Sequence, residues 1–199
     1  MINKTDGAFL SGFFVSEIPN TNIVIGPYPL YEIDVEKIKQ TGVTAVLNLQ
    51  IPIEVLQRGV DQASIELYYK AKKIQTIVNH TIDDTNEDNL VKCLLSGVMQ
   101  LYQLVNERKQ RVYVHCTSSI TRTPTLVVIY LCLFVLTEDW QNPQKVCDLI
   151  KKFHKISFPN IKAILRVIRE NKHIQDKILA EREEERLRKL RIAEEEAER

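Results

Sequence analysis

Short apolar runs rich in β-branched residues alternate along this chain with longer stretches in which apolar residues recur at helical spacing. The short runs predict strands at 22–25, 43–49, 74–78 and 111–114. The longer stretches predict helices at 30–40, 61–73, 89–108, 123–136, 142–154 and from 161 onward. Because strands alternate with helices, we expect an α/β fold: a three-layer single domain with a central, mainly parallel sheet of four to five strands flanked by helices.

The patterning divides the chain into three parts. Residues 1–20 carry Gly, Pro and Phe without periodicity and predict an irregular N-terminal extension, residues 21–173 form the domain, and residues 174–199 predict a long charged helix rich in Glu, Arg and Lys. This helical tail is either a solvated helix or a helix docked on a partner protein. The N-terminal extension is a second possible docking segment.

The junction between the predicted strand 111–114 and the helix that follows it carries the candidate chemistry. Cys116 and Arg122 stand there with five residues between them. A tight loop that leads from a strand to a helix N-terminus is suited to bind an anion, because loop N–H groups and the helix dipole supply positive charge. The same surroundings favour a thiolate at Cys116, and the guanidinium of Arg122 can bind two phosphate oxygens at once.

This segment, with His115 before the cysteine and Thr123 after the arginine, resembles the His-Cys-x5-Arg-Ser/Thr signature of the cysteine-dependent protein phosphatases, most of all their dual-specificity branch. An acidic segment at 83–90 is similar to the acid loop of that family in sequence and in distance from the cysteine. The resemblance covers about residues 22–172. Segments 46–50, 111–117 and 159–164 also resemble the plant glucan phosphatases.

The resemblance implies a role for each residue of the motif. Cys116 would attack phosphorus and form a phosphocysteine, and Arg122 would bind the phosphoryl oxygens. Asp84 would act as general acid and then as general base, with Asp83 and Asp88 as competing candidates. The phosphate would be held by the loop residues Thr117, Ser118, Ser119, Ile120 and Thr121, together with Arg122.

The two residues that flank the Cys-x5-Arg sequence, His115 and Thr123, can each be interpreted in two ways. His115 would orient the loop and support the thiolate, or it is a satisfied core histidine. Thr123 would steady the thiolate as the intermediate breaks down, or it is a helix N-cap. The resemblance implies neither a cofactor nor a metal.

The loop departs from the family pattern at its third position after the cysteine, where Ser119 replaces glycine. If this position needs a positive φ, the serine side chain costs about 1–2 kcal/mol. We therefore expect a phosphatase acting on phosphotyrosine, phosphoserine or phosphothreonine, and we keep two alternatives. The first is a weak or inactive phosphatase-fold binding module that serves as a structural subunit, and the second is a glucan phosphatase.

The composition of the chain limits the classes of partner and the cellular compartment that we expect. A net charge of +1 over 199 residues gives no reason to expect nucleic acid as a partner, and the longest apolar run is too short to span a membrane. The four cysteines form no Cys-x-x-Cys pair and no zinc-ligand spacing. We expect a phosphorylated protein as substrate and a reducing, cytoplasmic location.

Overall fold

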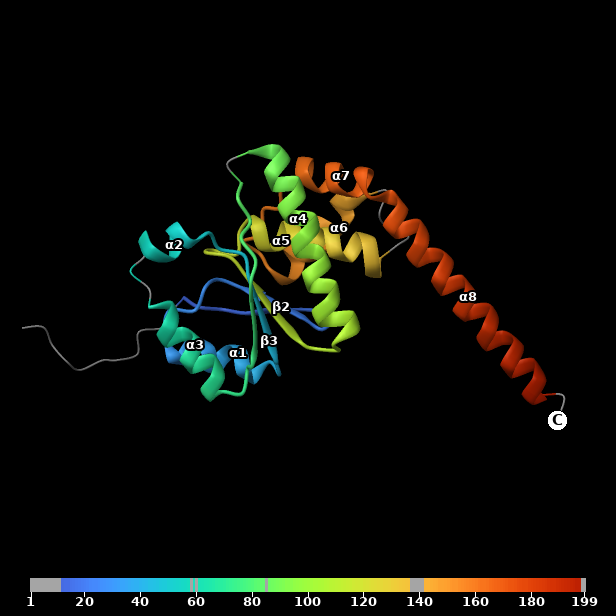
Figure 1. Ribbon diagram of the computed structural model, residues 1–199, viewed down its shortest axis with the longest axis horizontal. Helices are drawn as coiled ribbons and strands as arrows, with labels where there is room; N and C mark the ends of the chain where they lie inside the picture. Colours follow the sequence, from blue (N-terminus) through green and yellow to red (C-terminus); the bar gives the residue numbers. More distant parts are fainter. Residues whose placement is uncertain (1–11, 58, 60, 85, 137–141, 198–199) are drawn as a thin grey trace, which may run out of the picture.

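A five-stranded sheet forms the centre of the molecule in the computed structural model, which describes residues 12–57, 59, 61–84, 86–136 and 142–197 (Figure 1). The strands lie in the order β1 (Ser16–Ile18), β2 (Ile23–Gly26), β5 (Val112–His115), β3 (Ala45–Asn48) and β4 (Thr76–Asn79). All neighbouring strands are parallel except β1, which pairs antiparallel with β2 at the sheet edge. The predicted mainly parallel sheet is confirmed.

Helices connect the strands and cover both faces of the sheet (Figure 1). Their bounds are α1 (Glu32–Gln40), α2 (Pro52–Gln57), α3 (Gln62–Ala71), α4 (Glu87–Tyr102), α5 (Arg122–Tyr130), α6 (Pro143–Phe153), α7 (Ile161–Glu170) and α8 (Lys172–Ala197). Two of the predicted helices, 89–108 and 123–136, end in a π-helical turn: η1 (Gln103–Glu107) follows α4, and η2 (Leu131–Val135) follows α5.

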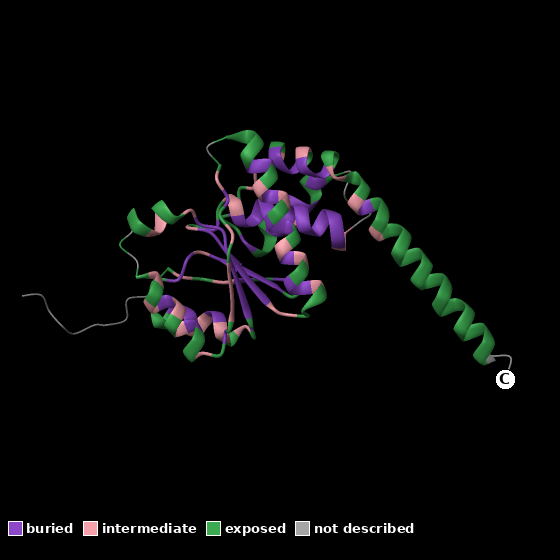
Figure 2. Cartoon of the chain, in the orientation of Figure 1, coloured by how far each residue is buried: buried purple, intermediate pink, exposed green. Residues whose placement is uncertain are grey.

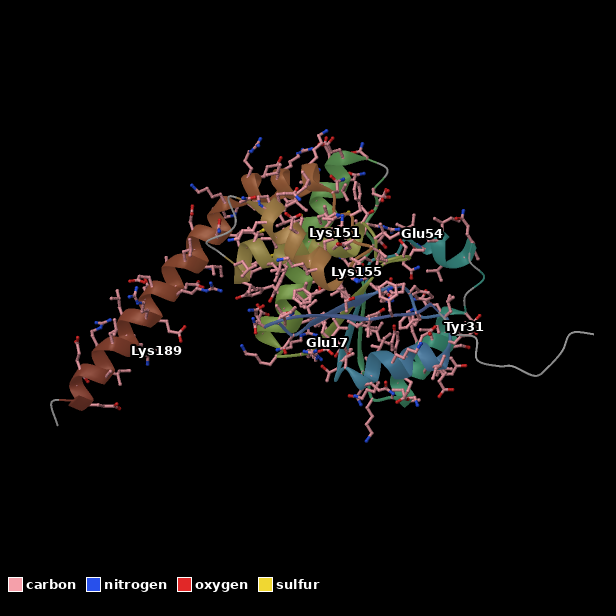
Figure 3. The ribbon with its side chains drawn as sticks, turned by 180° about the vertical axis from the view of Figure 1, so that it is seen from behind. Glu17, Tyr31, Glu54, Lys151, Lys155 and Lys189 are labelled. Carbon is pink, nitrogen blue, oxygen red and sulfur yellow. The ribbon has the colours of Figure 1, made fainter. Side chains whose placement is uncertain are left out.

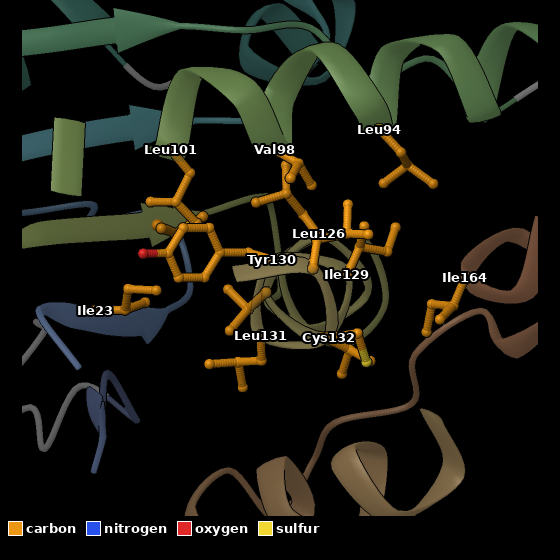
Figure 4. Close-up of a cluster of buried hydrophobic side chains, with 14 of the residues drawn as sticks. Ile23, Leu94, Val98, Leu101, Leu126, Ile129, Tyr130, Leu131, Cys132 and Ile164 are labelled. Atoms are coloured by element: carbon orange, nitrogen blue, oxygen red, sulfur yellow. The ribbon is translucent and has the colours of Figure 1, made fainter. Parts of the chain in front are cut away.

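Side chains of the central strands alternate between two apolar cores, as the period of a strand requires. On β5, Val114 packs into a core shared with α4, α5, α6 and α7, whereas Tyr113 packs on the other face with residues of α1 and α3. Figure 4 shows part of the larger core, which includes Leu94 and Val98 of α4 and in which Val98 lies beside Leu126 of α5. Because both faces of the sheet are covered, only its ends are open to a ligand.

Two elements were not expected from the sequence. Residues 1–20 were predicted to be irregular, yet β1 lies within them; residues 1–11 lie outside the described part of the chain. Helix α2 also went unpredicted, because it has only six residues and its apolar side chains, Ile53 and Leu56 among them, are exposed and form no buried stripe. Both elements matter for the site described below, because α2 and β1 each supply a side chain to it.

The charged tail forms the predicted helix, α8, which leaves the domain and runs outward (Figure 1). Its first turns pack against the domain, where Gln175 is fully buried and Arg182 donates to the carbonyl oxygen of Phe134. Beyond Arg182 the described part of the helix is exposed (Figure 2). Among the described helices, none is both long enough and apolar enough to cross a membrane.

Candidate active site

The predicted phosphate loop lies at the carboxyl end of β5, directly before α5, where ligands bind in open α/β sheets. Cys116 is the first residue after the strand, and its side chain belongs to the larger core, so the residue is only 2% exposed. The backbone N–H of Ser119 donates to Cys116 Sγ at 3.2 Å. The loop therefore directs at least one backbone donor toward the sulfur atom.

Ser119 takes the left-handed conformation that a glycine would adopt without strain, with φ at +60°. The residue is fully buried, and its hydroxyl has no hydrogen-bond partner among the described residues. The conditional expectation of a positive φ at this position is confirmed. The serine therefore carries both the backbone strain of about 1–2 kcal/mol and an unsatisfied hydroxyl.

Carbonyl groups of the loop are bound from the segment that joins α6 to α7. His154 Nε2 donates to the oxygen of Ser119 at 2.9 Å, and the N–H of Phe158 donates to the oxygen of Ile120 at 2.7 Å. At the start of the loop, Gln50 Nε2 donates to Thr117 Oγ1 at 3.1 Å. Gln50 ends the segment 46–50 that resembles the plant glucan phosphatases, but no role at the site was assigned to it from the sequence, and His154 lies in no recognised motif.

Arg122 begins α5 and is held by Glu54 of α2, a residue that the sequence did not single out. Arg122 Nη1 donates to Glu54 Oε2 at 2.8 Å and to the carbonyl oxygen of Leu49 at 3.3 Å, and Nη2 donates to Glu54 Oε1. Burial alone would raise the pKa of the Glu54 carboxyl, but the hydrogen bonds and positive charge of Arg122 outweigh it and hold this pKa below its usual value.

The candidate general acids differ in what surrounds them. Asp84 Oδ2 lies 3.9 Å from Arg122 Nε, and the Asp84 side chain is 53% exposed. Asp88 instead pairs with Arg166 Nη2 of α7 at 2.6 Å, so its carboxylate points to a different part of the molecule. The geometry favours Asp84 over Asp88.

His115 and Thr123 are both buried, and their surroundings differ. The ring of His115 packs beside Tyr28 and Tyr113, and its Nδ1 lies 3.4 Å from the carbonyl oxygen of Cys116. Burial lowers the pKa of His115 to about 3, so the ring is neutral. Helix α5 has Thr121 as its N-cap, so the interpretation of Thr123 as an N-cap is wrong. The hydroxyl of Thr123 is buried without a partner among the described residues.

Beside the loop lies a surface cavity of about 590 Å³. Among its lining residues are Thr121, Gln144, Lys151, Phe158, Pro159 and Asn160. Phe158 is 74% exposed there, Lys151 is exposed as well, and Asp148 also lines the cavity. Figure 3 shows Lys151 and Lys155 from the same side as Glu54, which holds Arg122. Apolar side chains, a lysine and an aspartate thus line the cavity beside the loop.

This chain resembles known proteins in sequence over about half of its length. No family model matches it. The chain is 32% identical over 109 residues to the chloroplastic phosphoglucan phosphatase LSF1 of Arabidopsis thaliana, a match that covers 55% of this chain and 18% of that protein. The chain therefore spans less than a fifth of the length of this relative.

Solved structures match over most of the described domain. The crystal structure of PTPMT1 in complex with PI(5)P superposes with a TM-score of 0.60 at 21% identity, over 84% of this chain and 97% of that one. The kinase-associated phosphatase with a substituted catalytic-site cysteine gives a TM-score of 0.60 at 13% identity, over 84% and 97% of the two chains. The chain therefore has the fold of the cysteine-dependent phosphatases of the dual-specificity type and carries a Cys-x5-Arg sequence in its strand-to-helix loop.

Proposed function

We propose that this protein hydrolyses phosphate monoesters through a phosphocysteine intermediate. One observation supports the proposal most strongly: three groups meet at a single loop. The Cys116 thiol lies next to a backbone N–H donor, Arg122 lies where the loop enters α5, and Asp84 lies near Nε of Arg122. A nucleophile, an oxyanion site and a proton donor are the groups that phosphoryl transfer requires.

In the proposed first step, Cys116 Sγ attacks phosphorus, a sulfur–phosphorus bond forms, and the bond from phosphorus to the ester oxygen breaks. Asp84 donates its proton to the leaving oxygen, while Arg122 and the loop N–H groups stabilise the phosphoryl oxygens. A water molecule then attacks phosphorus, Asp84 accepts its proton, and Sγ leaves as thiolate with release of inorganic phosphate. We assign the Thr123 hydroxyl, which has no partner in the described part of the chain, to stabilising the departing thiolate.

Hydrolysis of a small aryl phosphate between about pH 5.5 and pH 7.5 tests this function. We expect turnover that vanadate blocks and that Cys116→Ser abolishes. The control is Cys132→Ser, because Cys132 is a buried thiol of the core that lies outside the loop. Absence of turnover above the Cys116→Ser background would contradict the proposal.

Phosphorylated protein side chains are the substrate class that the surface beside the loop supports best. Exposed Phe158, Lys151 and Lys155 can contact the apolar and acidic residues that flank a phosphorylated side chain. Release of phosphate from phosphotyrosine, phosphoserine and phosphothreonine peptides of one sequence would measure the preference among the three.

A phosphoglucan is the second candidate substrate, and the similarity to LSF1 over 109 residues supports it. Phosphate release from phosphorylated amylopectin, compared with release from a phosphopeptide at matched phosphate concentration, separates the two classes. A kcat/KM for amylopectin above that for peptides would replace the protein substrate with the glucan.

A catalytically weak binding module remains the alternative to an enzyme. The strained Ser119 and the exposed outer part of α8 support it, since the first impairs the loop and the second offers a surface to a partner protein. If Ser119→Gly converts an inactive protein into an active one, the natural chain is the binding module.

We also propose that the protein works in a reducing compartment such as the cytoplasm. None of the four cysteines, all of which lie in the described part of the chain, forms a disulfide, and the proposed nucleophile acts only as a thiolate. Fractionation of cells that express the full chain would locate it.

A further inference from the structure

The phosphate loop is held from outside by residues 154–158, which we call the brace. Two consecutive loop carbonyls point to it: the oxygen of Ser119 accepts from His154 Nε2 at 2.9 Å, and the oxygen of Ile120 accepts from the Phe158 N–H at 2.7 Å. The first bond comes from a side chain and therefore depends on which residue stands at 154. The second comes from the backbone and does not depend on side-chain identity.

These two bonds set the direction of the loop donors. In a trans peptide the carbonyl and the following N–H point to opposite sides, and the described backbone has no cis bond. Because the carbonyls of Ser119 and Ile120 point to the brace, the N–H groups of Ile120 and Thr121 point away from it. The N–H of Ser119 already points to Cys116 Sγ. Consecutive inward N–H groups of this kind form an anion-binding concavity.

The hydrogen bonds of His154 fix the position of one ring proton and fit a neutral ring. A carbonyl oxygen only accepts, so Nε2 must carry the proton, and Nδ1 is then free to accept from the hydroxyl of Ser16 on β1 at 2.9 Å. The ring is fully buried and packs beside Phe14, with ring centres 5.3 Å apart. Burial also holds the pKa of His154 below its usual value, which is consistent with this neutral form.

Ser119 is the residue that needs such support. Its φ of +60° is unfavourable for a serine, and a residue in this conformation persists only when its surroundings enforce it. The hydroxyl of Ser119 contributes nothing to this, because it has no partner among the described residues. The hydrogen bond from His154 ties the Ser119 carbonyl to a residue outside the loop.

We propose that His154 is a positioning residue of the phosphate loop: oriented by Ser16, it holds the Ser119 carbonyl outward and thereby keeps the loop N–H groups directed at the bound oxyanion. The proposal rests on the proposed function only in that the loop binds an oxyanion. It requires no turnover. His154 thus supplies through a tertiary contact the loop geometry that a glycine at position 119 would permit without support.

Inorganic tungstate, titrated into the full-length protein by calorimetry, tests the proposal independently of catalysis. We expect His154→Leu to weaken tungstate binding about tenfold, because one buried hydrogen bond is lost. Ser16→Ala leaves the Nε2 donor in place and should weaken binding about threefold. His154→Gln retains an amide donor and should also lose less than His154→Leu. The control is His173→Gln, an exposed histidine on α8, which should bind like the wild type.

The decisive measurement repeats His154→Leu in a Ser119→Gly background. Glycine adopts a positive φ without strain, so the same substitution should then weaken tungstate binding about threefold or less. Thermal unfolding of each variant identifies the temperature at which all of them are folded, and binding is compared there. A purely structural role would lower the unfolding temperature and leave tungstate affinity unchanged in both backgrounds.

Three results would overturn the proposal. Equal losses of affinity with serine and with glycine at position 119 would show that His154 does not act through this residue. Wild-type tungstate affinity in folded His154→Leu would show that the histidine does not position the loop. If His154→Leu does not fold, wild-type affinity in both Ser16→Ala and His154→Gln would show the same. A wild-type protein that binds no tungstate would instead refute the proposed function, and the positioning role with it.

Discussion

Glu54 and Arg122 meet along one edge of the guanidinium and leave the other edge open. Nη1 of Arg122 donates to Glu54 and to the carbonyl oxygen of Leu49, and Nη2 donates to the other carboxylate oxygen of Glu54. Within the described residues, Nε donates no hydrogen bond, and Nη2 uses only one of its two protons. The carboxylate of Asp84 lies 3.9 Å from Nε. The open edge therefore has two parallel donors for phosphoryl oxygens and faces the candidate general acid. Glu54 orients Arg122 without covering this edge.

Glu54→Gln should lower kcat/KM for an aryl phosphate about tenfold and weaken vanadate inhibition. Its amide nitrogen cannot accept the second hydrogen bond, so the guanidinium is held less rigidly in its binding orientation. Steady-state kinetics with vanadate inhibition measures both effects, and Glu66→Gln on α3 is the matched control. Tighter vanadate binding in Glu54→Gln would show instead that Glu54 competes with phosphate for Arg122.

Protein stability should depend on pH through Glu54. Its pKa is lower in the folded protein than the ordinary value of 4.5, so the unfolded state binds more protons near that pH. The stabilisation is fully present above about pH 4.5 and is lost as the pH falls through the folded-state pKa. Urea unfolding of wild type and Glu54→Gln between about pH 3 and pH 6 should show a steeper pH dependence for the wild type. Parallel curves would contradict this.

Asp84→Asn should lower kcat strongly on a phosphate ester with a poor leaving group, about 100-fold, whereas Asp83→Asn should change it little. With a very good leaving group the loss for Asp84→Asn should shrink, because the leaving oxygen then needs less protonation. Kinetics of both variants on both esters measures this. Similar losses for the two variants on the two esters would defeat the assignment of Asp84.

Ser119→Gly should stabilise the protein by about 1 kcal/mol. It removes about 1–2 kcal/mol of left-handed strain and a buried hydroxyl that no described residue hydrogen-bonds, offset by the roughly 0.5–1 kcal/mol entropic cost of glycine. The control is Ser119→Ala, which removes the hydroxyl and keeps the strain. Urea unfolding of both variants separates the two contributions. A Ser119→Gly protein less stable than Ser119→Ala would refute this account.

Lys151 and Lys155 should favour acidic phosphopeptides. Replacing both by Glu should lower kcat/KM about tenfold at low salt for a phosphopeptide flanked by acidic residues, and much less for its amide-flanked counterpart. Lys189→Glu on the distant α8 is the control (Figure 3). Equal losses of kcat/KM on both peptides would show that these lysines do not interact with the acidic flanking residues.

The sequence by itself determined the parts of this protein that depend on local pattern. The β-branched runs and the helical stripes marked the four parallel strands and the helices that cover them, because burial on a sheet or helix face repeats with a fixed period. The spacing of Cys116 and Arg122 marked the loop, because both residues belong to one continuous turn.

Only the tertiary structure decided how that loop is supported. Glu54 lies 68 positions before Arg122, His154 lies 35 positions after Ser119, and Ser16 lies 138 positions before His154. None of the three was marked as a site residue by its own segment: Glu54 lies on a helix of six residues that buries none of them, His154 is the C-cap of α6, and Ser16 begins a strand of three residues. Local periodicity reports which face of an element is buried. It does not report which distant side chain meets that face, because chain packing sets that contact.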